Sequence, residues 1–441
     1  MTQSLFHTLW GEANQAHSSA IHTSQTNNNF LQEIQPSEPP EGEQELLGLS
    51  VPEHLKKYGG FKKGGHNDYN PDLYEHHFKK RLTYAEWKKL PRGVKDQPLS
   101  GANAYIISLT SWPPRTNPGT PGIWLVIEGL MRQRTKPDRI ILWLSSEEYP
   151  YGRYHLPQTL LDLEKRGLEI KFMQGNGHAA NKLLPCFANK IAANIITVDD
   201  DILYPDHLVT DLKVAHQKTP HAVIGNAGHV ILNLKNGVVQ SMLKYVSPPH
   251  VTYFNPLKKE HSLYVLPGKQ LTLSLAAGSR GILYPFDSTG STFNGLHRDV
   301  MNSEYVLKFA TRNDDMWFHA CRLKANTDLY SAGCDLAFIE DYPYQLIGKN
   351  DFLDGALHDE NKKLVFFKKG NNLFKTCRYD EDLRKILRHF PEVCKAMGAD
   401  PLKEHCPAVL CKKFSKRRRF INAVKSFLGF EKHKGEKNRL V

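Results

Sequence analysis

The stretch Ile195–Pro205, which reads IITVDDDILYP, decides the fold of this chain. Its apolar, β-branched start runs directly into three consecutive carboxylates, Asp199, Asp200 and Asp201. The apolar run predicts a buried parallel strand, and ligands of open α/β sheets gather outside the carboxyl ends of such strands. Adjacent acids repel one another unless a cation neutralises them, and oxygen-only ligands favour Mg²⁺ or Mn²⁺ over zinc. We therefore interpret the triplet as a metal or nucleotide site. The alternatives are a solvated acidic loop and a helix N-terminus, where the dipole favours acids.

Length and composition are those of an ordinary soluble protein. The 441 residues suffice for two or three domains, with 40% hydrophobic and 24% charged residues. No window approaches the roughly 20 continuous apolar residues of a membrane span, and the N-terminus lacks the regions of a secretory signal. Seven scattered cysteines without a CxxC pair favour reduced thiols in a cytoplasm over a disulfide framework. The last four and His405 match no standard zinc spacing, which favours buried thiols.

From Ala104 onward, strand and helix patterns alternate. Apolar runs predict four strands, and helical spacing with capping residues predicts the helices between them. Short connections in such an alternation indicate a parallel sheet with helices on both faces, a Rossmann-like nucleotide-binding half. The predicted strands are Tyr105–Leu109, Arg139–Leu144, Leu168–Phe172 and Ile195–Val198, and the predicted helices are Thr120–Met131, Leu156–Arg166, Asn181–Lys190 and Asp206–Lys218.

The regions on either side differ in composition. Residues 1–100 form a polar, partly flexible extension whose second half mixes basic and aromatic residues. That mixture can mark nucleic-acid binding, but glycines, prolines and acids interrupt it and favour an extension packed on the main domain. Further along the chain, His221–Leu232 and Leu263–Leu275 are β-rich, while Thr311–Leu323 and Tyr379–Ala396 have helical patterns.

The C-terminal tail carries most of the net charge. Lys412–Val441 contains eleven Lys or Arg and two Glu, which accounts for +9 of the total +12. Its apolar residues share one helical face, and a basic amphipathic helix suits an anionic membrane surface, to which each basic residue contributes on the order of 1 kcal/mol. Nucleic acid is the rival acidic partner, and a solvated tail is the third alternative. We expect membrane contact and no nucleic acid.

Six sequence blocks occur in a fixed order: IISLTSWPPR, KPDRIILWLSSEEYP, NKLLPCF, ITVDDDILYP, GSRGILYP and NDDMWFHACRL. In this order they resemble bacterial glycosyltransferases of the GT-A, family-2-like class, which are linked to lipopolysaccharide or capsular polysaccharide synthesis. The resemblance covers about Ala104 to Leu346, somewhat over half of the chain. It implies the fold class α/β, a GT-A type Rossmann-like mixed sheet flanked by helices, as a domain over residues 101–360. An N-terminal extension over 1–100 and a C-terminal helical region with a basic tail over 361–441 have no counterpart in the family pattern.

On the donor side, the resemblance implies a nucleotide-sugar and Mn²⁺ or Mg²⁺ at a DxD-type motif, here Asp199 to Asp201. Asp201 and Asp199 are the candidate metal ligands, and Asp200 is expected to face the sugar or ribose. Lys182 could reach a phosphate, and it matches the block before the DxD strand. Thr110, Ser111 and Arg115 match the first donor-binding loop, so the candidate donor-binding residues are Thr110, Ser111, Arg115, Lys182, Asp199 and Asp200.

On the acceptor side, the segment Gly278, Ser279, Arg280 and Gly281 resembles the family's acceptor segment. Asp314 and Asp315 match the later acidic pair, which in inverting relatives includes the general base. A carboxylate can deprotonate the acceptor hydroxyl as it attacks the anomeric carbon, and a pair allows one pKa to rise while the other acid stays ionised. The alternative is a helix N-cap and its neighbour after Asn313. The base is left open between the two acids, with Asp315 preferred.

The leading hypothesis is a cytoplasmic glycosyltransferase, peripheral on the inner face of the membrane, that extends a saccharide or lipid-linked saccharide. A metal-dependent nucleotidyltransferase or phosphotransferase also uses strand-end acids, but it ordinarily shows a GxxxxGK[ST] loop, which this sequence lacks. A non-catalytic carbohydrate-binding protein with a vestigial site is the third hypothesis. The sequence leaves the sugar, nucleotide, linkage and acceptor open, because pocket shape sets them.

Overall fold

A computed structural model of the chain describes residues 29–38, 68–95, 97–116, 123–226, 229–231, 234–239, 250–255, 260–265, 274–276, 278–311, 313–332, 364–369, 372–407 and 409–413. The chain divides into the units Met1–Phe30 and Leu31–Val441, and the second holds every element described below.

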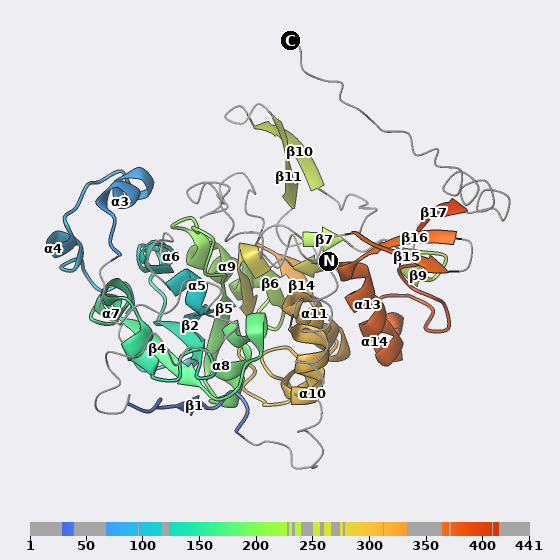
Figure 1. Ribbon diagram of the computed structural model, residues 1–441, viewed down its shortest axis with the longest axis horizontal. Helices are drawn as coiled ribbons and strands as arrows, with labels where there is room; N and C mark the ends of the chain where they lie inside the picture. Colours follow the sequence, from blue (N-terminus) through green and yellow to red (C-terminus); the bar gives the residue numbers. More distant parts are fainter. Residues whose placement is uncertain are drawn as a thin grey trace, which may run out of the picture. The chain divides into compact units, whose positions relative to one another are not determined.

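An eight-stranded mixed sheet forms the centre of this unit (Figure 1). The neighbouring strands β4, β3, β2 and β5 run parallel, as the alternation of strands and helices predicts. Strand β13 pairs antiparallel with both β5 and β6, so β5 and β6 run in the same direction. In sheet order, the strands are β1 (Glu33–Ile34), β4 (Leu168–Met173), β3 (Arg139–Ser145), β2 (Gly101–Thr110), β5 (Ala193–Thr197), β13 (Ile282–Tyr284), β6 (Val223–Gly225) and β14 (Leu329–Ser331).

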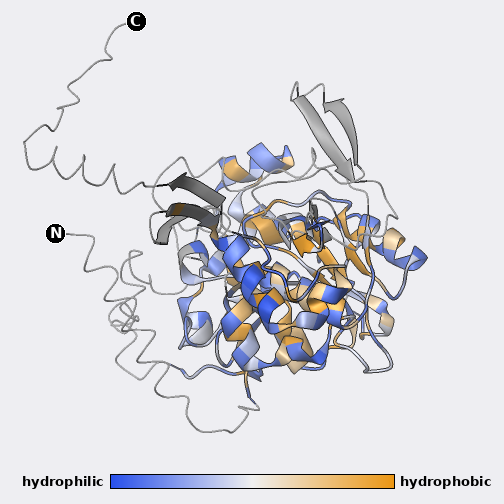
Figure 2. Ribbon diagram, turned by 90° about the vertical axis from the view of Figure 1, so that its right-hand side faces the viewer, coloured by the Kyte–Doolittle hydropathy of each residue, from blue (hydrophilic) through white to orange (hydrophobic). Residues whose placement is uncertain are grey.

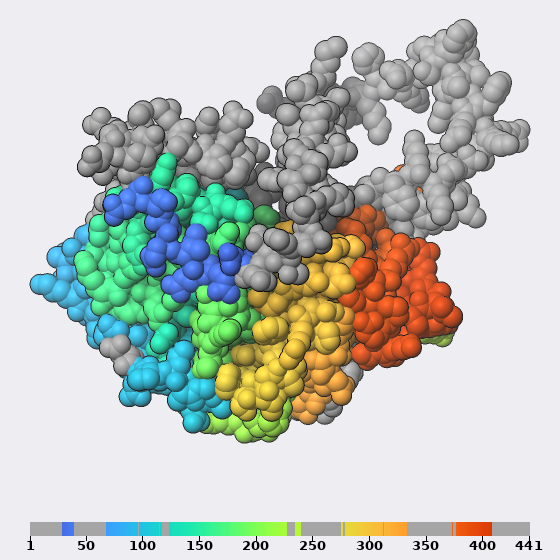
Figure 3. All heavy atoms as spheres, turned by 90° about the horizontal axis from the view of Figure 1, so that it is seen from below, coloured from blue at the N-terminus to red at the C-terminus, as the bar shows by residue number. Residues whose placement is uncertain are grey.

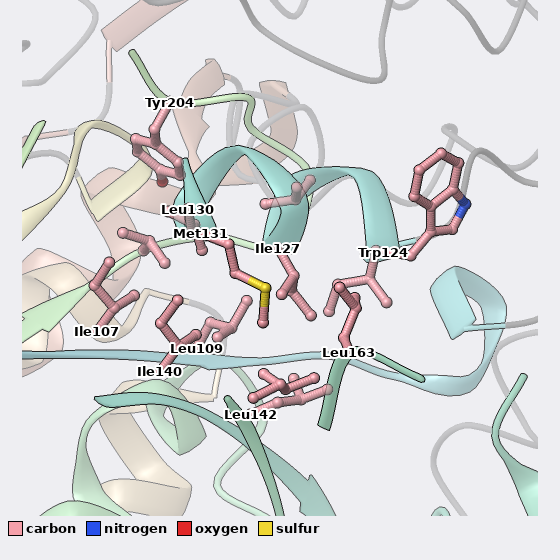
Figure 4. Packing of buried hydrophobic residues seen from close by; sticks show 14 of the residues in the cluster. Ile107, Leu109, Trp124, Ile127, Leu130, Met131, Ile140, Leu142, Leu163 and Tyr204 are labelled. Carbon is pink, nitrogen blue, oxygen red and sulfur yellow. The ribbon is translucent and has the colours of Figure 1, made fainter. Parts of the chain in front are cut away.

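Helices cover both faces of the sheet, which is why its central strands are apolar throughout. The face that packs on α6 (Ile123–Met131) holds alternate strand residues such as Ile107 and Leu142, and every residue of α6 is buried. Figure 4 shows this contact, with Ile127 and Met131 of α6 above the sheet. On the other face, the 3-10 helix η3 (His178–Lys182) packs on β2 and β3. Figure 2 shows the resulting concentration of hydrophobic residues on the inner strands. The remaining helices around the sheet are α5 (Pro113–Thr116), η2 (Gly152–His155), α7 (Gln158–Glu164), α8 (Leu184–Ala188), α9 (Leu208–Lys218), η4 (Gly278–Arg280), η5 (Arg298–Met301), α10 (Ser303–Tyr305), η6 (Val306–Ala310) and α11 (Asp314–Lys324).

Two described pieces of the segment before residue 100 pack on this sheet unit. Residues 31–38 supply the edge strand β1, which pairs antiparallel with β4 and shows as a dark-blue strip on the surface in Figure 3. The helices α3 (Pro71–Phe78) and α4 (Tyr84–Trp87) bring a cluster of aromatic rings onto α6, where the ring centroids of Trp87 and Trp124 lie 5.7 Å apart. The indole N–H of Trp87 donates to Glu128 at 3.0 Å, and Glu128 also pairs with the buried Arg166 at 2.6 Å. The division at residue 100 stays a prediction.

The C-terminal region adds a three-stranded antiparallel sheet of β15 (Leu364–Lys369), β16 (Asn372–Cys377) and β17 (Val409–Lys413). The helical pattern Tyr379–Ala396 is two helices, α13 (Arg378–His389) and α14 (Pro391–Ala396), because Pro391 lacks an N–H and suits a first turn. Short strand pairs complete the described elements: β7 (His229–Ile231) with β12 (Ser274–Ala276), β8 (Leu234–Lys235) with β9 (Val238–Val239), and β10 (His250–Asn255) with β11 (Glu260–Val265).

The cysteines and the tail bear on two sequence predictions. Cys186, Cys321, Cys377 and Cys394 are buried free thiols, and Cys406 is also buried. The described residues contain no group of three or more His, Cys, Asp or Glu that could hold a metal. The predicted basic helix of the tail, including Phe420, lies outside the described residues. Within the part of the chain that the structure describes, no helix has the length and apolar character needed to span a bilayer.

Candidate active site

The acidic triplet follows β5 at the carboxyl edge of the sheet. Asp199 begins a tight turn, in which its N–H donates to the hydroxyl of Tyr204 at 2.8 Å. Ile202 and Tyr204 return to the apolar core, at 3% and 4% exposure. The three acids are therefore held at the sheet edge, because buried residues precede them in β5 and follow them at Ile202 and Tyr204.

Arg115 of α5 neutralises two of these acids. Its guanidinium pairs with Asp200 and, at 2.7 Å, with Asp201. Ser111 donates its hydroxyl proton to the second oxygen of Asp200 at 2.5 Å. Burial works to lower the pKa of Arg115, but Asp200 and Asp201 outweigh it and raise that pKa. The loop after β2 thus reaches the acids, as the match to a donor-binding loop predicts.

Asp201 nevertheless remains easy to protonate. Burial raises its pKa to about 7, and the neighbouring carboxylates Asp200 and Asp199 act in the same direction, while Arg115 opposes them. Lys182 also lowers this pKa, but Arg115 and Lys182 together face five carboxylates, the triplet and the pair Asp314 and Asp315, so negative charge remains in excess. The excess negative charge favours a further cation at this edge of the sheet.

Lys182 connects the triplet to a second acidic group. Its ammonium lies 2.8 Å from Asp199, 3.0 Å from Asp314 and 3.9 Å from Asp315. The lysine is 5% exposed, and it stands at the end of η3. Burial alone lowers a lysine pKa, but Asp199, Asp314 and Asp315 outweigh it and raise the pKa of Lys182 well above its ordinary value. One buried cation therefore joins residues from three separate parts of the chain.

Asn313 is the N-cap of α11, and Asp314 and Asp315 are its first two helical residues, so the alternative that these acids are the cap and its neighbour is wrong. Asp314 is nearly enclosed, with 9% of its side chain exposed, whereas Asp315 exposes 29%. Burial raises the pKa of Asp315 to about 7, and Asp314 adds to the rise. Asp314 also has a raised pKa, again because it is buried. Asp315 is therefore the more accessible of the two acids.

Gly278 completes this group. Its N–H donates to Oδ2 of Asp315 at 2.8 Å. A Cβ at this position would stand 2.4 Å from Oδ1 of Asp315 and 2.9 Å from Nζ of Lys182, so any other residue would displace one of them. The GSRG block therefore approaches the acidic pair through its backbone. Glycine is the residue type that permits such an approach.

The remaining predicted site residues lie near the acids, but their described contacts are with other parts of the fold. Thr110, at the end of β2, donates its hydroxyl proton to the carbonyl of Trp143 at 2.8 Å. Ser279 and Arg280 are half-buried members of η4 next to Gly278. Gly281 has a φ of +87° and faces Leu208 of α9. The roles of these residues in donor or acceptor binding stay predictions.

Sequence reasoning did not single out Tyr204 or Arg322. Tyr204 lies within the opening stretch, yet only the turn geometry brings its hydroxyl back to Asp199. Arg322 follows the NDDMW block by helical spacing on α11, but nothing in the pattern shows that its side chain is buried, at 4% exposure.

The donor set has the chemistry of a magnesium or manganese site. Asp199 and Asp201 offer only oxygen atoms, and these ions are usually held by one or two carboxylates together with substrate phosphates. The described residues supply no complete cage by themselves. The two carboxylates therefore fit a divalent ion whose remaining ligands come from a bound diphosphate.

Comparisons with known proteins give a match in structure only. No protein-family model matches the sequence, and no curated protein matches it. TarS from S. aureus is similar at 12% identity with a TM-score of 0.28, over 52% of this chain and 57% of that chain. The mannosyltransferase PcManGT from Pyrobaculum calidifontis, in complex with GDP-Man and Mn²⁺, is similar at 14% identity with a TM-score of 0.22, over 36% and 43%.

A third solved structure is glucosyl-3-phosphoglycerate synthase from Mycobacterium tuberculosis in complex with Mn²⁺, UDP and phosphoglyceric acid. It is similar at 13% identity with a TM-score of 0.21, over 32% of this chain and 51% of that chain. The chain thus spans about half the length of the solved structures that it matches. Since each TM-score lies below 0.5, these likenesses support no statement about the activity of this chain.

Proposed function

We propose that the chain is a metal-dependent, inverting glycosyltransferase that moves a sugar from a nucleotide-sugar to a saccharide acceptor. The observation that carries this proposal is the position of Lys182 between the strand-end acid Asp199 and the helix acids Asp314 and Asp315. Glycosyl transfer needs two groups of this kind side by side, one for the leaving diphosphate and one for the incoming hydroxyl.

On the acceptor side, Asp315 is the general base. Its carboxylate takes the proton of the acceptor hydroxyl, while the acceptor oxygen forms a bond to the anomeric carbon. The bond from that carbon to the diphosphate breaks, and the nucleoside diphosphate leaves with the electron pair. Asp315 suits this role better than Asp314 because it is more exposed and lies farther from Lys182, at 3.9 Å against 3.0 Å. A pKa near 7 matches a base that works near neutral pH.

On the donor side, Asp199 and Asp201 would hold the metal, and Ser111 and Arg115 orient Asp200 beside them. The ion, when bound, supplies positive charge that offsets the charge developing on the leaving diphosphate. Arg115 and Lys182 keep the carboxylates in place before the donor arrives.

The natural acceptor in this proposal is a cell-surface saccharide of the lipopolysaccharide or capsule type, used at the inner face of the cytoplasmic membrane. The basic residues of Lys412–Val441 support this location, because a basic amphipathic segment binds anionic lipid. Removing Lys412–Val441 should release the protein from vesicles that contain anionic lipid. Unchanged binding of the shortened chain would rule out this membrane contact.

A screen of nucleotide-sugars tests the proposed activity. The full chain is incubated with each donor and Mn²⁺, and release of nucleoside diphosphate is measured with and without EDTA. One donor should be turned over, EDTA should abolish the turnover, and Asp201→Asn should reduce it at least about tenfold through loss of a metal ligand. Arg139→Gln, on a surface pair with Glu169, is the control and should behave as the wild type. If no donor is bound or turned over, the proposal is wrong.

A further inference from the structure

A small cavity lies between α11 and the sheet, directly beside the acidic pair. Its empty space is about 240 Å³, which includes open solvent at its mouth. Asp315, His319 and Arg322 come from one face of α11, at positions i, i+4 and i+7. The wall opposite them is formed by Tyr284 of β13 and by apolar residues of the sheet, and the full lining is Val223, Ala276, Ile282, Tyr284, Asp315, Phe318, His319, Arg322 and Leu329.

Arg322 is a buried charge that forms no ion pair among the described residues, although the nearby carboxylate Asp328 acts to raise its pKa. Its side chain donates to the carbonyl of Thr327 and lies 3.4 Å from Nδ1 of His319, while its Nε has no acceptor among the described residues. No described carboxylate lies within 4.0 Å of its guanidinium, since no ion pair of Arg322 is present in this part of the chain. Burial lowers its pKa to about 10, so the group is still charged at neutral pH.

Among the described residues, a second buried arginine shows the ordinary solution. Arg166 is as buried as Arg322, at 4% exposure, and it pairs with the buried Glu128 at 2.6 Å. Burying an unpaired charge is costly, so proteins neutralise such groups with a partner or a ligand. Arg322 has the burial of Arg166, but its neighbouring carboxylate, Asp328, forms no comparable ion pair with it among the described residues.

We propose that this cavity binds an anionic group of the acceptor, a carboxylate or a phosphate, through the guanidinium of Arg322. The inference rests on the proposed function, because it places the acceptor. Asp315 stands at one end of the cavity and Arg322 two helical turns farther along α11. An acceptor anchored by its anionic group at Arg322 therefore presents a nearby hydroxyl to the base.

The size and donors of the cavity favour one small charged group. Because the 240 Å³ includes open solvent, the enclosed part is smaller and suits a small functional group. Guanidinium groups recognise carboxylates and phosphates with parallel N–H donors, and the unpartnered Nε supplies one of them. The apolar wall strengthens such a contact because it excludes water.

Binding of inorganic phosphate to the full-length protein tests the cavity without any sugar donor. In isothermal titration calorimetry, wild type should bind phosphate, Arg322→Gln should weaken binding at least tenfold, and Arg322→Lys should lie between them. Ala276→Val fills the cavity without touching the charge, and it should also remove binding. The matched control is Arg115→Gln at the diphosphate side, which should keep the cavity's phosphate affinity. Thermal unfolding of each variant establishes that it is folded.

Two results would overturn the inference. If wild type binds no phosphate, the cavity holds water only. If Arg115→Gln loses binding while folded Arg322→Gln or Ala276→Val keeps it, phosphate sits at the diphosphate side. Should Arg322→Gln fail to fold, Ala276→Val and Arg322→Lys decide between these outcomes.

A pair of acceptors then tests the role in transfer. With the donor found by the screen, wild type should use a sugar phosphate at least tenfold better in kcat/KM than the same sugar without phosphate. Arg322→Gln should bring this ratio close to one, and Arg322→Lys should restore part of it. Equal use of both acceptors by wild type would refute the anionic acceptor while leaving the transferase in place. Absence of transfer to any acceptor would instead count against the proposed function.

Discussion

Replacing Lys182 by methionine tests the junction on which the site is built. Methionine keeps the length of the side chain but removes the ammonium that lies 2.8 Å from Asp199 and 3.0 Å from Asp314. Breaking a buried ion pair by removing one partner costs about 3–5 kcal/mol, because the remaining charges are left uncompensated. Lys182 is 5% exposed, so solvent screens this loss only weakly. We expect Lys182→Met to lower the free energy of unfolding by about this amount at pH 8.

The loss should depend on pH in a defined direction. Without the ammonium, which lowers the pKa values of Asp314 and Asp315, those two pKa values rise further in the folded state. A carboxyl whose folded pKa is raised stabilises the protein at low pH and loses that contribution as pH rises through the folded pKa. The difference between wild type and Lys182→Met should therefore be smaller at pH 5.5 than at pH 8.

Urea unfolding at both pH values measures this effect, with Lys171→Met as the matched control. Lys171 pairs with Glu33 at 2.6 Å but is 21% exposed on the sheet edge, and such pairs contribute about 1 kcal/mol or less. A loss in Lys182→Met no greater than in Lys171→Met would refute the electrostatic role of Lys182. An equal loss at pH 5.5 and pH 8 would refute the assignment of that loss to ionised carboxylates.

We expect four further results, which concern the site residues and the residues that pack around them. Gly278→Ala should lower the transfer rate about 10²-fold with the protein still folded, because its Cβ displaces Asp315; a normal rate would show that the contact is not needed. The pH profile of kcat/KM should rise with a slope of one and level off above about pH 7, as Asp315 loses its proton; a plateau that already begins near pH 5 would exclude this carboxyl as the base. Tyr204→Phe should lower the free energy of unfolding in urea by about 1–3 kcal/mol, because the N–H of Asp199 loses its acceptor. A decrease below about 0.5 kcal/mol would contradict the importance of that hydrogen bond. Trp87→Ala should lower the free energy of unfolding by about 3–5 kcal/mol. An unchanged free energy would show that the packing of the α3–α4 segment on the core does not stabilise the fold.

Much of the sheet could be predicted from apolar periodicity. Ile195–Val198 corresponds to β5 at Ala193–Thr197, and the first three predicted strands lie within or overlap β2, β3 and β4. Strand β13 was not predicted as an antiparallel member, because three apolar residues between a glycine block and a proline do not fix a direction. The direction of β13 is decided by its pairing with β5 and β6, and these strands lie far from it in the sequence. The mixed α/β fold class is confirmed by the strand order.

The candidate site also has a part that local sequence signals predict and a part that only the fold brings together. The acids, Ser111 and Arg115 follow from motif position at strand ends, which is a local signal. The meeting of Lys182 with Asp314 was not predictable, because it joins residues separated by more than one hundred positions through the fold. The burial of Arg322 escaped prediction for a related reason, since an arginine on a helix is ordinarily exposed.

The most direct test of the central claim is a single-turnover measurement on Asp315→Asn with the donor found by the screen. We expect this variant to bind donor and Mn²⁺ with nearly wild-type affinity, while transfer to the acceptor falls at least about 10²-fold through loss of the general base. Asp314→Asn should retain more transfer activity, because Asp314 faces Lys182 rather than the substrate. Wild-type transfer by Asp315→Asn would contradict the claim that the helix acid joined to the strand-end acids by Lys182 deprotonates the acceptor.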